Sequence, residues 1–147
     1  MRACVVLVIA FLLPLVAGSA LGKAKPGRYV VDAKGETVLD TTTKLTWQRF
    51  VPSAAATWQG AKDACKALAL AGGGWRLPGV RELATLVDLG QLNPAIDKTA
   101  FPNTPAESFW SATAYSGSSS YAWNVYFNGG YSNSHGVTNT YRVRCVR

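Results

Sequence analysis

Catalytic and metal-binding side chains are scarce in this chain of 147 residues, which has one histidine and one methionine. His135 has no acidic residue near it in the sequence, and the GxSxG motif of serine hydrolases does not occur. The eight acidic residues are isolated and form no calcium-type loop. We therefore expect a protein that is not an enzyme and that has no metal site and no cofactor.

Long apolar runs are missing too, with one exception at the N-terminus. Arg2 precedes an apolar stretch, residues 4–18, and Gly18-Ser19-Ala20 follows as a small-residue cleavage site. This order is typical of a secretory signal peptide cleaved after Ala20. A single membrane-spanning anchor is the alternative, and Pro14 favours cleavage.

We expect three segments along the chain: a signal peptide at 1–20, a linker at 21–27 and a single domain at 28–147. The mature protein would then be exported, to the periplasm, the outer surface or the medium. It would keep no stable membrane span.

Cysteine is sparse as well, and of the three cysteines Cys4 leaves with the signal. Two cysteines in an exported domain most often form one disulfide. A bond between Cys65 and Cys145 would close a loop of 80 residues. A metal pair and a catalytic thiol are the alternatives, but two cysteines and one histidine make a poor metal set, and a catalytic thiol usually needs a base beside it.

Positive charge, in contrast, is in excess. The formal net charge is +7, with 15 basic and eight acidic residues. Such a surface favours polyanions. Export makes nucleic acid the least expected of them, and the basic residues form no run. Ordinary solubility charge is the alternative explanation.

The first half of the chain predicts short strands and then two helices. Residues 28–48 show short alternating runs separated by turns. Thr57 is a good N-cap for a helix whose apolar positions share one face and whose end we expect at residues 72–74. A second amphipathic helix is expected within residues 79–90, followed by an irregular loop at 91–108, pinned by its prolines and Phe101.

From Phe109 onward the pattern predicts strands, the last of them at residues 140–147. In that strand Arg142 and Arg144 should point away from the side that carries Cys145. The predicted fold class is α+β: two helices packed on a small antiparallel sheet that also includes the N-terminal strands, with long loops.

Trp75, Arg76 and Glu82 are predicted to be structural residues. Arg76 lies between two apolar residues, so its guanidinium needs a partner, and Glu82 on the following helix can supply one. Contact with a ligand is the alternative role for this pair.

Residues 123–135, "WNVYFNGGYSNSH", predict a β-hairpin with its turn at Asn128-Gly129. Residues 115–141 hold five Tyr, six Ser, four Asn and four Gly, a mixture typical of binding loops and of sugar recognition. The alternative is that tyrosine simply favours strands. We expect Trp123 in the core, with Asn124 and Tyr126 outside.

Nine residues are candidate ligand contacts, six polar or aromatic side chains of the hairpin, its histidine and two C-terminal arginines: Tyr121, Trp123, Asn124, Tyr126, Tyr131, Asn133, His135, Arg142 and Arg144. The partner is expected to be a polysaccharide or a surface protein. A structural or assembly domain of the cell envelope, with a protein partner, is the second hypothesis.

Several motifs occur in one order: "TKLTWQ" at 43–48, "WRLPGVRELATLVD" at 75–88, "FPNTPAESFWSAT" at 101–113 and "YRVRCVR" at 141–147. Together they resemble the bacterial C-terminal-domain family of the Legionella collagen-like adhesin, once catalogued as a domain of unknown function. The resemblance implies a C-type-lectin-like fold in which a disulfide joins the first helix to the last strand.

The resemblance also implies binding of sulfated polysaccharides and association as trimers, with Arg142, Arg144 and Arg147 as anion contacts. Two departures limit it. No collagen-like repeat is present, and "WNV" at 123–125 lacks the acidic residue of the calcium-binding "WND" of C-type lectins. The reactive cysteine pair of the related formylglycine-generating enzymes has no match if Cys65 and Cys145 are paired.

Overall fold

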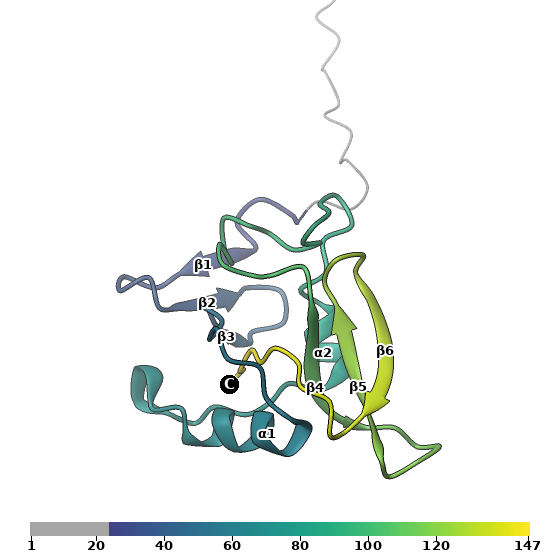
Figure 1. Cartoon of the computed structure of the whole chain (residues 1–147). Coiled ribbons are helices and arrows are strands. Elements are labelled where there is room, and N and C mark those ends of the chain that lie inside the picture. The colour runs from purple at the N-terminus through teal and green to yellow at the C-terminus, as the bar shows by residue number, and fades with distance from the viewer. Residues whose placement is uncertain (1–23) are drawn as a thin grey trace, which may run out of the picture.

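The structure, a computed structural model, describes residues 24–147; the expected signal peptide and its cleavage site lie outside the described residues. The fold is α+β, as predicted, with two helices, a 3₁₀ turn and two small antiparallel sheets (Figure 1). The elements are β1 (Tyr29–Val31), β2 (Thr37–Asp40), β3 (Thr46–Gln48), α1 (Trp58–Ala67), η1 (Leu70–Gly72), α2 (Val80–Ala84), β4 (Ser108–Ala114), β5 (Tyr121–Tyr126) and β6 (Tyr131–Gly136).

The strands form two separate sheets, so the expectation of one shared sheet is wrong. The first sheet has the order β1-β2-β3 and the second the order β4-β5-β6. The N-terminal strands are only three or four residues long, and they pair with one another and not with the strands of the second sheet. The space between the sheets is taken by residues 141–147, the C-terminal tail, whose end lies between them in Figure 1.

The C-terminal tail is not the strand that its alternation predicts. It forms isolated bridges, with Val146 opposite both Trp47 and Arg76 and with Arg142 beside Phe109. Its carbonyls accept from different parts of the chain: Cys145 O from the Gln48 N–H and Val146 O from the Arg76 N–H, both at 2.9 Å. The tail therefore joins the first sheet, the segment before α2 and the second sheet.

Helix α1 begins where the sequence predicts it. The Thr57 hydroxyl accepts from the Gly60 N–H at 3.3 Å, and Ala61 and Cys65 are buried on one face. The helix ends at Ala67, earlier than expected, because Leu68 adopts an extended backbone. The turn that follows the helix is held by a side-chain bond of its own, in which Leu70 O accepts from the Trp75 indole at 2.6 Å.

Helix α2 is also shorter than predicted and covers Val80–Ala84. The Thr85 hydroxyl donates to Glu82 O at 2.6 Å, and the chain continues through turns that bury Leu86. Helix α2 packs on one face of the second sheet. The loop at residues 91–107 is irregular, as expected, and Phe101 anchors it in the core with its ring edge-on to Tyr29 at 5.2 Å.

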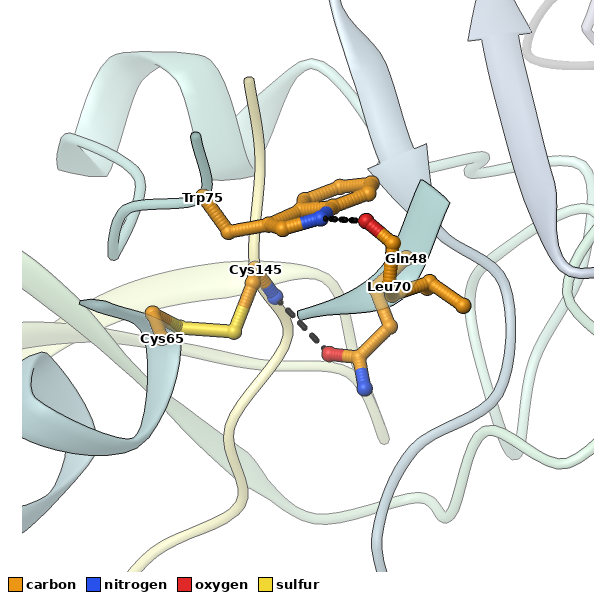
Figure 2. Close-up of a disulfide and its surroundings, with 5 residues drawn as sticks. All are labelled: Gln48, Cys65, Leu70, Trp75 and Cys145. Atoms are coloured by element: carbon orange, nitrogen blue, oxygen red, sulfur yellow. Dashed lines mark hydrogen bonds between the residues drawn. A yellow bond between two sulfur atoms is a disulfide. The ribbon is translucent and has the colours of Figure 1, made fainter. Parts of the chain in front are cut away.

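The predicted disulfide is present and lies in the core. Cys65 and Cys145 are bonded with their Cα atoms 5.4 Å apart, and both side chains are buried (Figure 2). The Cys145 N–H also donates to Gln48 Oε1 at 3.2 Å, and Trp75 packs in the same cluster. The bond therefore fixes α1 to the tail at the point where the tail meets β3.

Replacing both cysteines with alanine should lower the free energy of unfolding by about 4 kcal/mol, because the bond closes a loop of 80 residues in the unfolded chain. Urea unfolding followed by circular dichroism measures this difference. Ala67→Ser, at an exposed position of the same helix, is the control and should change little. A loss below about 1 kcal/mol for the cysteine variant would contradict this account of the bond.

Candidate functional site

The predicted hairpin is present as β5 and β6, which pair in register from Tyr121–Gly136 to Tyr126–Tyr131. The loop between the strands has four residues, 127–130, so the turn is longer than the Asn-Gly pair alone. Gly130 has a φ of +76°, and a Cβ there would lie 2.6 Å from Val87 Cγ1. Glycine is therefore required at Gly130, where the hairpin loop meets the segment after α2.

The hairpin places the candidate residues on two opposite faces, because side chains alternate along a strand. One face, here called the hairpin face, carries Asn124, Tyr126, Tyr131, Asn133 and His135. Tyr121 and Trp123 point to the other face, where α2 packs. The structure thus brings five of the nine candidates together and separates two.

Asn124 lies at the base of the hairpin face and is fully buried, so the expectation that it points outside is wrong. Its Nδ2 lies 2.9 Å from His135 Nδ1, and its Oδ1 has no partner within residues 24–147. The amide is covered because Trp110 stands opposite it on β4 and Tyr141 of the tail packs on both Trp110 and His135.

Four of the five side chains of the hairpin face reach solvent, among them His135, which is half-buried. Tyr131 is 54% exposed and packs edge-on against the half-buried Tyr126, with ring centroids 5.4 Å apart. Asn133 is exposed and its Oδ1 accepts from the Ser134 N–H at 2.8 Å. These aromatic edges and the amide Nδ2 of Asn133 stand on paired strands, so their positions are fixed before any ligand arrives.

Trp123 is half-buried on the opposite face, not in the core. It packs edge-on against Tyr115, with centroids 5.6 Å apart, and lines a shallow pocket of about 170 Å³ between α2 and β6. Tyr121 is exposed on the same face. Its side chain therefore belongs to a different surface from the hairpin face.

Arg142 is partly exposed but is held by an ion pair. Its Nε donates to Glu107 Oε2 at 2.8 Å, and its guanidinium also bonds the carbonyl of Ser53. The hydrogen bond from Arg142 lowers the pKa of Glu107. An anionic ligand would have to displace this carboxylate to reach Arg142.

Arg144 is fully buried, so its expected role as a surface contact is wrong. Its guanidinium lies over the Phe101 ring at 4.5 Å and donates to Thr104 Oγ1 at 2.7 Å and to Gln48 O at 3.3 Å. Burial lowers its pKa to about 9, which leaves it charged at neutral pH. Arg144 is buried because the tail runs between the two sheets and has one of them on each side.

Arg76 and Glu82 form the expected ion pair. Nη1 and Nη2 of the guanidinium each lie 2.7 Å from one carboxylate oxygen. Glu82 also accepts from the Gly79 N–H at 2.8 Å, which fixes the start of α2. The hydrogen bonds from Arg76 lower the pKa of Glu82. Trp75, buried beside them, lies under the guanidinium of Arg147 at 5.0 Å.

A basic groove along α1 was missed from the sequence. Lys62 and Lys66 of the helix line it together with the Arg76–Glu82 ion pair, around a volume of about 520 Å³, so its excess positive charge comes from the two lysines. The feature of the sequence that could have predicted this groove is the i, i+4 spacing of the two lysines, which places both on one side of a helix. We call this the α1 groove.

Within residues 24–147, no group of three His, Cys, Asp or Glu side chains lies close enough to hold a metal ion. No helix of the same residues is long and apolar enough to cross a membrane.

The fold and the site define a disulfide-bonded α+β domain that displays aromatic and amide groups on a hairpin. The chain belongs to the Lcl C-terminal domain family, whose model matches residues 36–147. This confirms the family expected from the sequence. A comparison with curated proteins gave no match.

Arg144 and Arg142 should differ sharply when each is replaced with alanine. Arg144→Ala should lower the free energy of unfolding by about 3 kcal/mol, because it empties a core position and removes stacking on Phe101. Arg142→Ala should cost less than about 1 kcal/mol, because it breaks a partly exposed ion pair. Urea unfolding compares them, and equal losses would contradict the structural role assigned to Arg144.

Proposed function

We propose that this domain is an exported, non-enzymatic binding module that recognises a glycan through the hairpin face. The observation that carries the proposal is the common orientation of Tyr126, Tyr131 and Asn133 on one face of two regularly paired strands. Membership of the Lcl C-terminal domain family supports an adhesin-like role. The disulfide supports export, because such bonds persist in oxidising compartments.

The chemistry of the hairpin face suits a sugar. Tyrosine rings offer a rigid apolar surface for C–H groups together with a polar hydroxyl, while an asparagine amide hydrogen-bonds to sugar hydroxyls. The Asn133 Nδ2 has no partner within residues 24–147, whereas its Oδ1 is held by Ser134. One donor is thus free and oriented. A rigid strand also loses little conformational entropy on binding.

The charge of the protein favours an anionic glycan, such as a sulfated polysaccharide. Two of the three C-terminal arginines do not supply the contacts, since Arg144 is buried and Arg142 is paired. The exposed Arg147 donates to the carbonyls of Ala71 and Gly73 and has no carboxylate partner among the described residues. The lysines of the α1 groove are the better candidates, because neither has a carboxylate partner among the described residues. Lys62 in addition lies 3.7 Å from the centre of the Trp58 ring.

We also propose the C-type-lectin-like fold for this domain. The support is the bond between α1 and the C-terminal tail, which matches the connection that the family resemblance implies. Association as trimers is part of the same proposal.

A glycan array that includes neutral and sulfated polysaccharides tests the function. The oxidised protein should bind at least one glycan class at low salt. The double variant Tyr126→Ala/Asn133→Ala should weaken that binding about tenfold, because it removes a stacking surface and the free amide donor. Tyr121→Ala, at an exposed tyrosine of the opposite face, is the matched control and should bind as the unmodified protein does.

The same experiment also tests the proposal that the glycan is anionic. Binding of a sulfated glycan should fall with added salt and with Lys62→Ala/Lys66→Ala, but not with the control pair Lys34→Ala/Lys98→Ala on other surfaces. The proposal of glycan recognition is wrong if no glycan is retained at low salt, or if the Tyr126/Asn133 variant binds unchanged.

A further inference from the structure

Strand β6 leaves one edge of the second sheet open. The strand order is β4-β5-β6, and the other edge, β4, is covered by the tail, since the Trp110 N–H donates to Arg142 O at 3.0 Å and the Arg142 N–H to Ser108 O. Figure 1 shows β6 as the outermost strand of this sheet. An open edge presents unpaired backbone groups that can pair with another chain.

The register identifies which backbone groups of β6 point outward. The Val137 N–H donates to Ser120 O at 2.9 Å, so Ser120 and Val137 form a hydrogen-bonded pair. Hydrogen-bonded and non-hydrogen-bonded pairs alternate in antiparallel strands. Tyr131, Asn133 and His135 therefore bond to β5, and the three residues between and after them direct their N–H and C=O groups to the open edge: Ser132, Ser134 and Gly136.

Some of these outward groups are already occupied. The Ser134 N–H donates to Asn133 Oδ1 at 2.8 Å, and Gly136 O accepts from the Asn139 N–H at 3.0 Å. The Ser132 N–H, the Ser132 C=O and the Ser134 C=O have no partner among the described residues. In an antiparallel added strand, the residue opposite Ser132 could form two backbone hydrogen bonds with it. The residue two positions along, opposite Ser134, could donate a third to the Ser134 C=O.

The features that normally block strand addition are absent from β6. Natural edge strands are protected by lysine, proline, bulges or very short length. Strand β6 is six residues long, has the sequence YSNSHG, and pairs with β5 without a bulge. The open edge of the first sheet differs, because β1 has only three residues.

A pocket lies directly beside the open edge. Val80, Arg81 and Ala84 of α2 line it together with Trp123 and Ser132, around a volume of about 170 Å³. Residues that stand opposite each other on neighbouring strands place their side chains on the same face. A residue added opposite Ser132 would therefore direct its side chain toward this pocket, which has three apolar walls.

Charge specifies the partner further. Arg81 is exposed at the rim of the pocket and forms no ion pair with any described residue. The protein as a whole carries a net charge of +7. An acidic side chain on the added strand, two residues from the apolar one, would lie on the same face and within the field of Arg81.

We propose that the open edge of β6 accepts an extended peptide segment of a partner protein by strand addition. An apolar side chain of that segment fills the pocket beside Trp123, and an acidic residue pairs with Arg81. This inference goes beyond glycan recognition and uses a different surface, since the pocket lies on the face opposite Tyr126 and Tyr131.

The test begins with a random seven-residue peptide library displayed on phage and selected on the immobilised, oxidised protein. Enriched peptides should combine alternating apolar residues with at least one Asp or Glu. Synthetic copies should bind Ser132→Pro about tenfold or more weakly, because proline removes the outward N–H. Ser132→Ala keeps that N–H and should bind within about twofold of the unmodified protein.

Proline at this position takes away no hydrogen bond to β5, so the hairpin is expected to stay folded. Hydrogen exchange confirms this if the Asn133 and His135 amides stay protected in the variant. In the unmodified protein the Ser132 amide should become protected when the peptide binds. Trp123→Ala and Arg81→Glu should each weaken binding, through the pocket and through the charge.

Asn133→Ala separates this inference from glycan recognition. The change removes an amide donor from the hairpin face but frees the Ser134 N–H at the edge, so peptide binding should be kept or increased while glycan binding falls. Strand addition is excluded if no peptide is enriched over a blank support, or if the enriched peptides bind Ser132→Pro as tightly as the unmodified protein.

Discussion

The C-terminal tail is the constraint on which the rest of the structure depends. Two sheets of three short strands cannot bury their inner faces alone, and the tail runs between them with Val143, Arg144, Cys145 and Val146 all buried. Its backbone bonds β3, the segment before α2 and β4, and its cysteine holds α1. Seven residues thus connect every layer of the domain.

This arrangement explains where the functional groups lie. Because the tail covers part of the second sheet through Tyr141, the base of the hairpin face is buried at Asn124 while Tyr131 and Asn133 stay in solvent. Helix α2 covers the opposite face and leaves the pocket at Trp123. The hairpin is therefore held on both faces but left free along β6, so recognition groups are displayed on rigid strands.

Local sequence signals predicted the elements well and their surroundings less well. The hairpin around Asn128-Gly129, the Thr57 cap and the pairing of Cys65 with Cys145 depend on local chemistry or on cysteine count. The structure contains all three, with a hairpin loop of four residues instead of two. The burial of Asn124 and Arg144 depends on what packs on the second side of a strand or tail. The alternation of side chains along a strand predicts that it has two sides, but it does not reveal that other segments cover both. The polar character of these two residues therefore led to the wrong prediction that they are exposed.

Native-state hydrogen exchange tests the central role of the tail most directly. The Gln48, Arg76 and Trp110 amides belong to different parts of the fold, and each donates to a carbonyl of the tail. If the tail makes the domain one cooperative unit, these amides should exchange with the same free energy of opening, equal to that of global unfolding. A clearly lower value for Gln48 than for Trp110 would show that the first sheet opens by itself, which would contradict the account.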